Sequence, residues 1–128
     1  MDMSEIKDRT TVPDSATALS KGGRIIVAIA SAGRGPILSE TVAALGRQHR
    51  LPDLLLLSLG DPADGIDIAP EQLPFAVSVL IGPKGLTTQR NAILRALLPG
   101  DVVLMLDDDF LLAPDYIARL ETLFDDHP

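Results

Sequence analysis

The sequence predicts an α/β fold: a doubly wound, mostly parallel sheet of four strands with helices on both faces. Three observations predict it. Short apolar runs alternate with helical patterns along the chain, glycine, proline or aspartate ends each run, and no internal repeat or low-complexity tract is present. The length of 128 residues fits about one domain.

Residues 1–23 are polar and show neither helical nor strand periodicity. We expect them to be a flexible leader before a domain that covers 24–128. The first strand is expected at 24–31, "RIIVAIAS", because an unbroken β-branched run is typical of a strand covered on both faces.

A helix is expected after this strand. Gly33 and Gly35 interrupt the apolar run, and Pro36 suits the first turn of a helix. The helix should end near Arg50, because the residue before Pro52 disfavours helical geometry. Its apolar stripe consists of Leu38, Val42 and Leu45.

Three more strands and two more helices complete the alternation. We expect strands at 53–59 and 75–81, joined by a polar loop, and a fourth strand whose apolar residues 102–106 run straight into three aspartates. A helix is expected from about Leu86 to Leu98. A last helix begins at Pro114, with one face formed by Ile117, Leu120 and Phe124.

The composition excludes several classes of protein. The formal net charge is −7 and no Lys/Arg-rich run occurs, so we expect no nucleic-acid partner. The chain has no cysteine, which excludes disulfides and thiolate zinc sites and suits a cytoplasmic protein. No apolar stretch approaches the ~20 residues that span a bilayer, and no signal peptide is recognisable.

The candidate site lies where polar residues follow the strands. Ligands of doubly wound sheets bind outside the carboxyl ends of the strands, near a switch in strand order. Polar groups occur there in each case: 31–35, Gly60-Asp61, Lys84-Gly85 and 107–109.

The three aspartates favour a metal site. Strand side chains alternate, so Asp107 and Asp109 should point one way and Asp108 the other. The first two can share Mg²⁺ or Mn²⁺ with a bound diphosphate. The alternative is an acidic turn that caps the next helix, helped by Asp115. We favour the metal because the strand is expected to be an inner one.

A second candidate group lies on the helix expected at 86–98. Arg90 and Asn91 are predicted on the half that faces the sheet. An inward arginine near a helix start needs an anion or a carboxylate partner. Both a nucleotide phosphate and an internal ion pair with one of the aspartates would satisfy it, and the two are compatible.

At these residues the sequence resembles the family 2 glycosyltransferases with the GT-A fold. The resemblance rests on Gly85-x-x-x-x-Arg90-Asn91, then a strand running into Asp107-x-Asp109, then 111–117 "LLAPDYI". It covers roughly 24–128. It implies transfer of a sugar from a nucleotide-diphosphate donor to an acceptor, assisted by Mg²⁺ or Mn²⁺.

The resemblance also implies roles for single residues. Ser31, Gly33 and Asp61 would border the nucleoside. Arg90, with Asn91 beside it, would face the nucleotide. Asp107 would contact ribose or metal, and Asp109 the metal.

Two features depart from the family. The end of the first strand reads Ser-Ala-Gly-Arg-Gly where the family carries proline or threonine near an aromatic residue. The acceptor-binding half, with the general base, would follow Pro128, so we expect this chain to be a truncated donor-binding half. Neither His49 nor His127 is a good substitute for the base.

Other classes of protein remain as alternatives. A metal-dependent nucleotidyltransferase would use a similar acidic pair, with Gly33-Arg34-Gly35 as a faint phosphate loop. A dinucleotide-binding fingerprint fails because Leu38 stands where the third glycine belongs. A non-catalytic remnant that binds nucleotide-sugar or a partner is the third class. Truncation would expose a sheet edge or an apolar face, so we expect a homo-oligomer.

Overall fold

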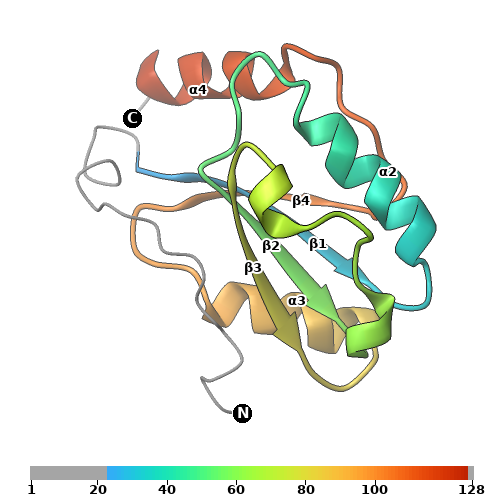
Figure 1. The fold of residues 1–128 in the computed structure, drawn as a ribbon. Helices are drawn as coiled ribbons and strands as arrows, with labels where there is room; N and C mark the ends of the chain where they lie inside the picture. Colours follow the sequence, from blue (N-terminus) through green and yellow to red (C-terminus); the bar gives the residue numbers. More distant parts are fainter. Residues whose placement is uncertain (1–22, 127–128) are drawn as a thin grey trace.

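The computed structural model describes residues 23–126, so the leader expected at 1–23 lies, except for Gly23, outside the described residues. The described chain is α/β, as predicted. Its strands and helices occur in the order β1 (Ile25–Ser31), α2 (Gly35–Leu45), β2 (Leu54–Leu59), β3 (Ala76–Ile81), α3 (Leu86–Arg95), β4 (Val102–Leu106) and α4 (Tyr116–Asp126), with two short 3₁₀ helices, Pro62–Asp64 and Pro70–Gln72, between β2 and β3 (Figure 1).

The four strands form one parallel sheet in the order β3-β2-β1-β4. Every residue of β1 and β2 is buried, which agrees with their unbroken apolar sequences. The expectation of a buried, inner fourth strand is wrong. Among the described residues β4 lies at the edge of the sheet, and Leu106 is its one buried residue. An edge strand has a neighbour on one side alone, so solvent reaches its other side.

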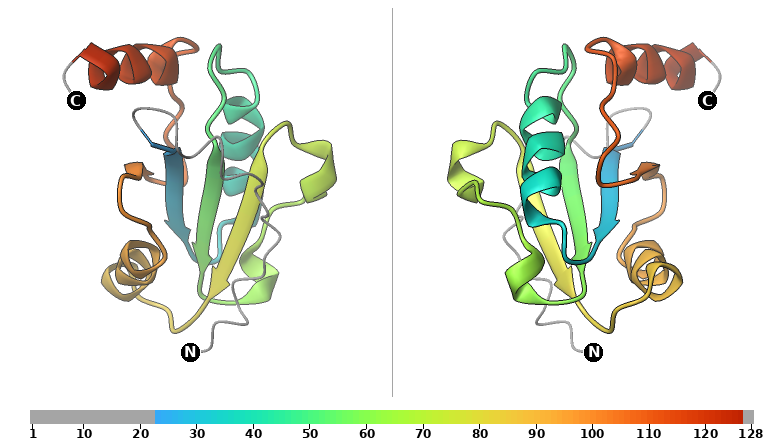
Figure 2. Two further views of the ribbon diagram at one scale, coloured as in Figure 1. Left: turned by 90° about the vertical axis from the view of Figure 1, so that its left-hand side faces the viewer. Right: turned by 90° about the vertical axis from the view of Figure 1, so that its right-hand side faces the viewer.

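Helices cover both faces of the sheet (Figure 2). α2 and α4 pack on one face, where the core contains Val27, Leu57 and Ile117. The loop between β2 and β3 adds Ile66 and Ile68 to the same face. Of the helices within residues 23–126, α3 packs on the other face, where Ile93 meets Ile26, Ala28 and Leu56. This arrangement is consistent with a Rossmann-like doubly wound fold.

The predicted apolar stripe of α2 is confirmed, because Leu38, Val42 and Leu45 are all buried. The predicted orientation of α3 is wrong. Gln89 and Ile93, one turn apart, face the sheet, while Arg90 and Asn91 are exposed. The helix is rotated by about one residue from the expected orientation because the Gln89 side chain is hydrogen-bonded beneath it.

α4 is attached to the sheet layer by polar contacts from the segment after α2. The Gln48 amide donates to the carbonyl oxygen of Ala113 at 2.6 Å and accepts from the N–H of Ile117 at 3.1 Å. Arg50 donates to Glu121 at 3.0 Å. Burial lowers the pKa of the Arg50 guanidinium, but hydrogen bonds and charge from Glu121 and Asp53 outweigh it, so the pKa is raised. No helix within residues 23–126 is long and apolar enough to cross a membrane.

Candidate functional site

The strand order places a topological switch point between β1 and β4. The chain runs from β1 outward through β2 and β3, then crosses by α3 to the opposite side of β1. Ligands of doubly wound sheets bind beside the carboxyl ends of the two strands at such a point. Ser31 ends β1 and Asp107 directly follows β4, so two predicted site residues lie at this switch point.

The turn after β1 presents Ser31 and Arg34 to the aspartates. Gly33 has a φ of 71°, a left-handed conformation that favours glycine. Beyond this turn, the Arg34 guanidinium lies 3.4 Å from Asp108 and 3.4 Å from Asp109. Ser31 is buried, and its hydroxyl donates to Asp108 at 2.8 Å.

Asp108 is the anchored member of the three aspartates. Its side chain is 12% exposed and is held by Ser31 and Arg34. Its backbone carbonyl accepts a 2.6 Å hydrogen bond from the hydroxyl of Thr41 on α2. These contacts from β1 and α2 fix the turn that follows β4.

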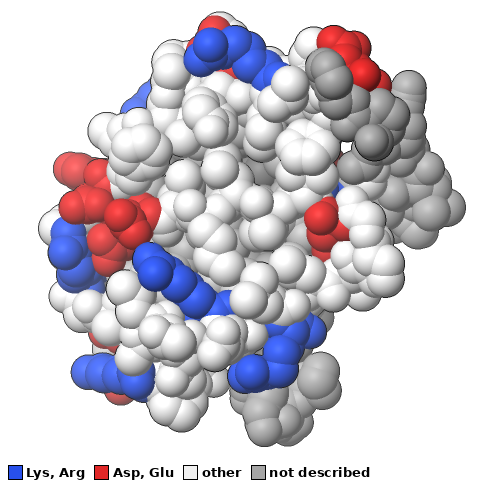
Figure 3. All heavy atoms as spheres, turned by 180° about the vertical axis from the view of Figure 1, so that it is seen from behind, with Lys and Arg blue, Asp and Glu red and all other residues white. Residues whose placement is uncertain are grey.

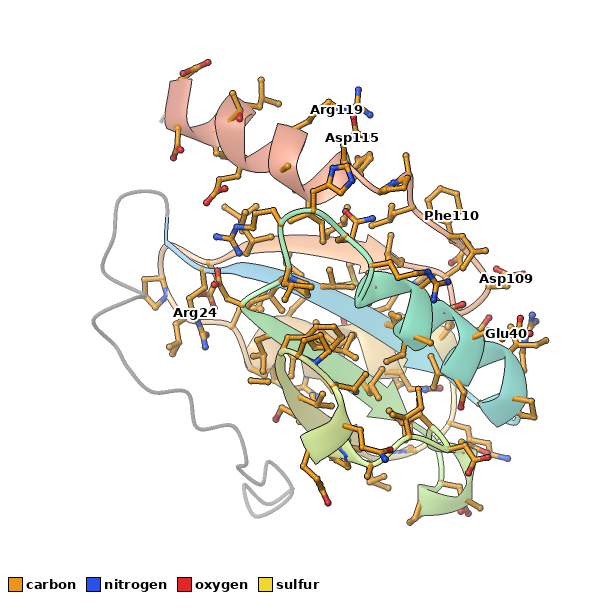
Figure 4. All side chains as sticks on the ribbon, turned by 45° about the horizontal axis from the view of Figure 1, so that its top comes forward. Arg24, Glu40, Asp109, Phe110, Asp115 and Arg119 are labelled. Carbon is orange, nitrogen blue, oxygen red and sulfur yellow. The ribbon has the colours of Figure 1, made fainter. Side chains whose placement is uncertain are left out.

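Asp107 and Asp109 point outward from this anchored turn, with 71% and 58% of their side chains exposed. The three residues form a turn rather than more strand, since the N–H of Phe110 donates to the Asp107 carbonyl at 3.2 Å. Figure 4 shows Asp109 beside α2, at the end of the sheet opposite Arg24. Asp115 lies directly before α4, where its backbone carbonyl accepts from the N–H of Arg119 at 3.0 Å and its carboxylate pairs with the Arg119 guanidinium at 3.2 Å.

Arg90 reaches Asp107 from α3. The two side chains form a 3.3 Å ion pair and are 45% and 71% exposed, so the internal pairing expected for Arg90 is confirmed at a solvated position. Asn91 is exposed on the same helix. The structure therefore brings Ser31, Arg90, Asp107 and Asp109 to one edge, with Asn91 on the outer side of α3.

Gln89 is the residue that sequence reasoning missed. It is 3% exposed, and its amide nitrogen donates to the carbonyl oxygens of Ser31 and Ser58, both at 2.8 Å. Its amide oxygen accepts from the N–H of Gly85 at 3.1 Å. One side chain thus joins the ends of β1 and β2 to the start of α3. The spacing of Gln89 and Ile93, four residues apart on a helix, is the signal that could have found it.

Asp61 lies at the same edge, after β2, but serves the local backbone. Its carboxylate accepts from the N–H of Ala63 at 2.8 Å and caps the 3₁₀ helix at 62–64. In that helix Asp64 is buried, and its Oδ2 has no hydrogen-bond partner among the described residues. Lys84 lies over Gly60, where a side chain on the glycine would collide with it.

Asp107 and Asp109 could hold a metal ion only together with ligands from water or a bound phosphate. No group of three or more His, Cys, Asp or Glu side chains within residues 23–126 is placed to hold one. Mg²⁺ commonly takes one or two carboxylates and completes its shell with water and substrate phosphates. Asp107 and Asp109 are accessible for such a role once their arginine partners release them.

Comparison with known proteins leaves the family open: no family model matches the chain, and no curated protein or solved structure matches it. The glycosyltransferase resemblance therefore depends on the two motifs and their spacing. The fold class and the positions of the side chains come from the structure.

Proposed function

We propose that the chain binds a nucleotide-diphosphate sugar, together with Mg²⁺ or Mn²⁺, as a family 2-like glycosyltransferase. The observation that supports this most is the position of Asp107 and Asp109. They are two exposed carboxylates, on an anchored turn, at the switch point where doubly wound sheets bind ligands.

The surrounding residues suit the other parts of such a donor. The turn at Ser31 and Gly33 and the loop at Asp61 would border the nucleoside. Arg90, with Asn91 next to it, would face the diphosphate, and Lys84 adds a further cation at this edge. A bound divalent ion would stabilise the charge of the leaving diphosphate.

Both outward aspartates have arginine partners, so ligand binding would be an exchange of partners. Arg90 can transfer from Asp107 to a phosphate while Asp107 takes the metal. The pairs are solvated and long, and exposed ion pairs contribute only ~0–1 kcal/mol. The exchange therefore costs little.

A metal-dependent nucleotidyltransferase is the alternative proposal. It would need a basic phosphate loop after β1. Arg34 occupies that loop, but its guanidinium is directed at Asp108 and Asp109. This loop, residues 32–35, has no basic residue besides Arg34, so the sugar donor is favoured. A non-catalytic protein that binds the same nucleotide-sugar would use the same contacts.

Calorimetric titration of UDP and GDP tests the proposal, with Mn²⁺ in one series and EDTA in the other. We expect binding only with metal. Asp109→Asn should weaken it by about tenfold to a hundredfold, the range for one lost charge-assisted interaction. Asp115→Asn is the matched control, because Asp115 is also exposed and paired with an arginine but lies beside α4.

Two results would contradict the proposal. Equal affinity with metal and with EDTA would show that nucleotide binding does not depend on the metal. Absence of binding to either nucleotide by a folded chain would exclude UDP and GDP as ligands.

A further inference from the structure

The open edge of the sheet carries a second inference, which is independent of the proposed function. β4 pairs with β1 alone among the described residues. Its sequence, VVLML, contains no charge, no proline and no glycine. Edge strands are commonly protected by lysine, proline, a bulge or a covering segment, and an unprotected apolar edge is a template for another strand.

The backbone pattern shows which groups the edge offers. The N–H of Val102 donates to the carbonyl oxygen of Arg24, directly before β1, at 2.8 Å. Peptide groups alternate sides along a strand, so Val102, Leu104 and Leu106 face β1. Val103 and Met105 therefore direct their N–H and C=O groups to the open side.

The surface around this edge is largely apolar, with the exposed carboxylate of Asp107 at its carboxyl end. A groove of about 370 Å³ runs beside the strand and is lined by Leu104, Leu106, Phe110, Leu112 and Tyr116, among others. Phe110 is 53% exposed. Figure 3 shows a broad surface without charged side chains on this face, with acidic and basic side chains gathered at its margins.

We propose that a second copy of the chain pairs with this edge, β4 against β4 in antiparallel orientation about a two-fold axis at Leu104. The chain carries a net charge of −7, so the repulsion between two copies is smallest where the surfaces that face each other carry no charge. The β4 strand is such a surface and is its own complement, as a two-fold interface requires.

The hydrogen-bond inventory selects the register. With the axis at Leu104, Val103 of each copy faces Met105 of the other, and about four intermolecular hydrogen bonds form. Moving the axis to Val103 would require the N–H of Asp101, which already donates to Leu98 at 3.0 Å. Moving it to Met105 would require the carbonyl of Asp107, which already accepts from Phe110 at 3.2 Å.

The same register predicts the contacts of the side chains. The two Leu104 side chains meet at the axis, and Val102 of each copy lies opposite Leu106 of the other, beside the apolar groove. At the ends, Asp101 of one copy lies opposite Asp107 of the other. Asp101 is already held by Arg24 at 2.9 and 2.8 Å, which reduces the repulsion.

The absence of native cysteine makes a crosslinking test clean. Opposed residues at a non-hydrogen-bonded antiparallel position lie ~4.5 Å apart at Cα, within the range for a disulfide. We expect Leu104→Cys to form a disulfide dimer on mild oxidation at low concentration. Leu94→Cys is the control, because Leu94 is 52% exposed on α3 and is not part of β4.

Light scattering on the unmodified chain supplies the second measurement. We expect twice the monomer mass at high concentration, the monomer for Val103→Pro, and severalfold tighter association for Asp107→Asn. If Val103→Pro does not fold, amide exchange on the unmodified chain replaces it, with protection of Val103 and Met105 rising with concentration. A monomer at all concentrations, assemblies larger than two, or equal crosslinking of Leu94→Cys and Leu104→Cys would overturn the proposal.

Discussion

At the carboxyl edge of the sheet, buried and exposed side chains alternate along the chain, and they differ in how firmly they are held. Gln89 and Asp108 are sheltered, and each has its side chain hydrogen-bonded to β1. Their neighbours Arg90 and Asp109 are exposed, and within residues 23–126 each is held by a long ion pair, at 3.3 and 3.4 Å. A single step along the sequence separates a framework residue from one that can meet a ligand.

The comparison shows how a small sheet can hold an accessible acidic turn. Three aspartates in a row repel one another, and this repulsion is reduced because the Asp108 side chain turns inward, away from the other two. Asp108 receives Ser31, Arg34 and the hydroxyl of Thr41, whereas Asp107 and Asp109 remain in water, where their charges are screened. The inner contacts position the turn, and the outer carboxylates remain available.

The largest effect is expected at Gln89. Gln89→Met keeps the length of the side chain but leaves the carbonyls of Ser31 and Ser58 and the N–H of Gly85 without this partner. The hydrogen bonds to the two carbonyls are buried, and each buried polar group left unpaired costs ~1–3 kcal/mol, so we expect a loss of about 2–6 kcal/mol in the free energy of unfolding. Urea denaturation measures it.

Arg90→Met is the matched control, with the same new residue one position further along α3. Its exposed site predicts a change within about 0.5 kcal/mol. Similar losses for the two variants would contradict the distinction between framework and ligand-facing residues.

A smaller effect is expected at Asp108. Asp108→Ala removes the acceptor of the Ser31 hydroxyl and the partner of Arg34, while the backbone bond to Thr41 can persist. We expect a loss of about 1–3 kcal/mol in thermal or chemical denaturation. Asp109→Ala should change stability by about 0.5 kcal/mol or less, because its carboxylate is solvated. A reversed order would mean that the acidic turn is held by its outer carboxylates.

Local patterns predicted much of this fold. The four strands and the buried face of α2 follow from apolar runs and helical spacing, which depend on residues close in sequence. The order of the strands depends on contacts between distant segments, and the edge position of β4 was missed for that reason. The rotation of α3 was missed because Leu86, Leu94 and Leu98 are apolar but exposed, which blurs its amphipathic pattern.

The candidate site divides along the same line. The position of Ser31, Asp107 and Asp109 at one edge of the sheet could be predicted because polar residues follow the strands there. Gln89 and Thr41 were not, because their partners lie 58 and 67 residues away in sequence. Helical spacing with Ile93 can place Gln89 on the inner face of α3, but it does not show that the side chain links two strand ends. Such residues require the three-dimensional arrangement.

The smallest effect on stability, and the sharpest test of the comparison, is expected for Arg90→Ala. Its ion pair with Asp107 is long and solvated, so the free energy of unfolding should change by about 0.5 kcal/mol or less. If Arg90 serves a diphosphate, the same variant should weaken UDP binding by ~1–3 kcal/mol in the presence of Mn²⁺, the contribution of a charge-assisted hydrogen bond. Arg119→Ala is the control, because Arg119 is similarly exposed and paired but lies on α4. Calorimetry and denaturation of the same samples separate the two effects. Loss of stability without loss of affinity would mean that Arg90, like Gln89, supports the fold. It would also mean that Arg90 is not the cation that binds the diphosphate.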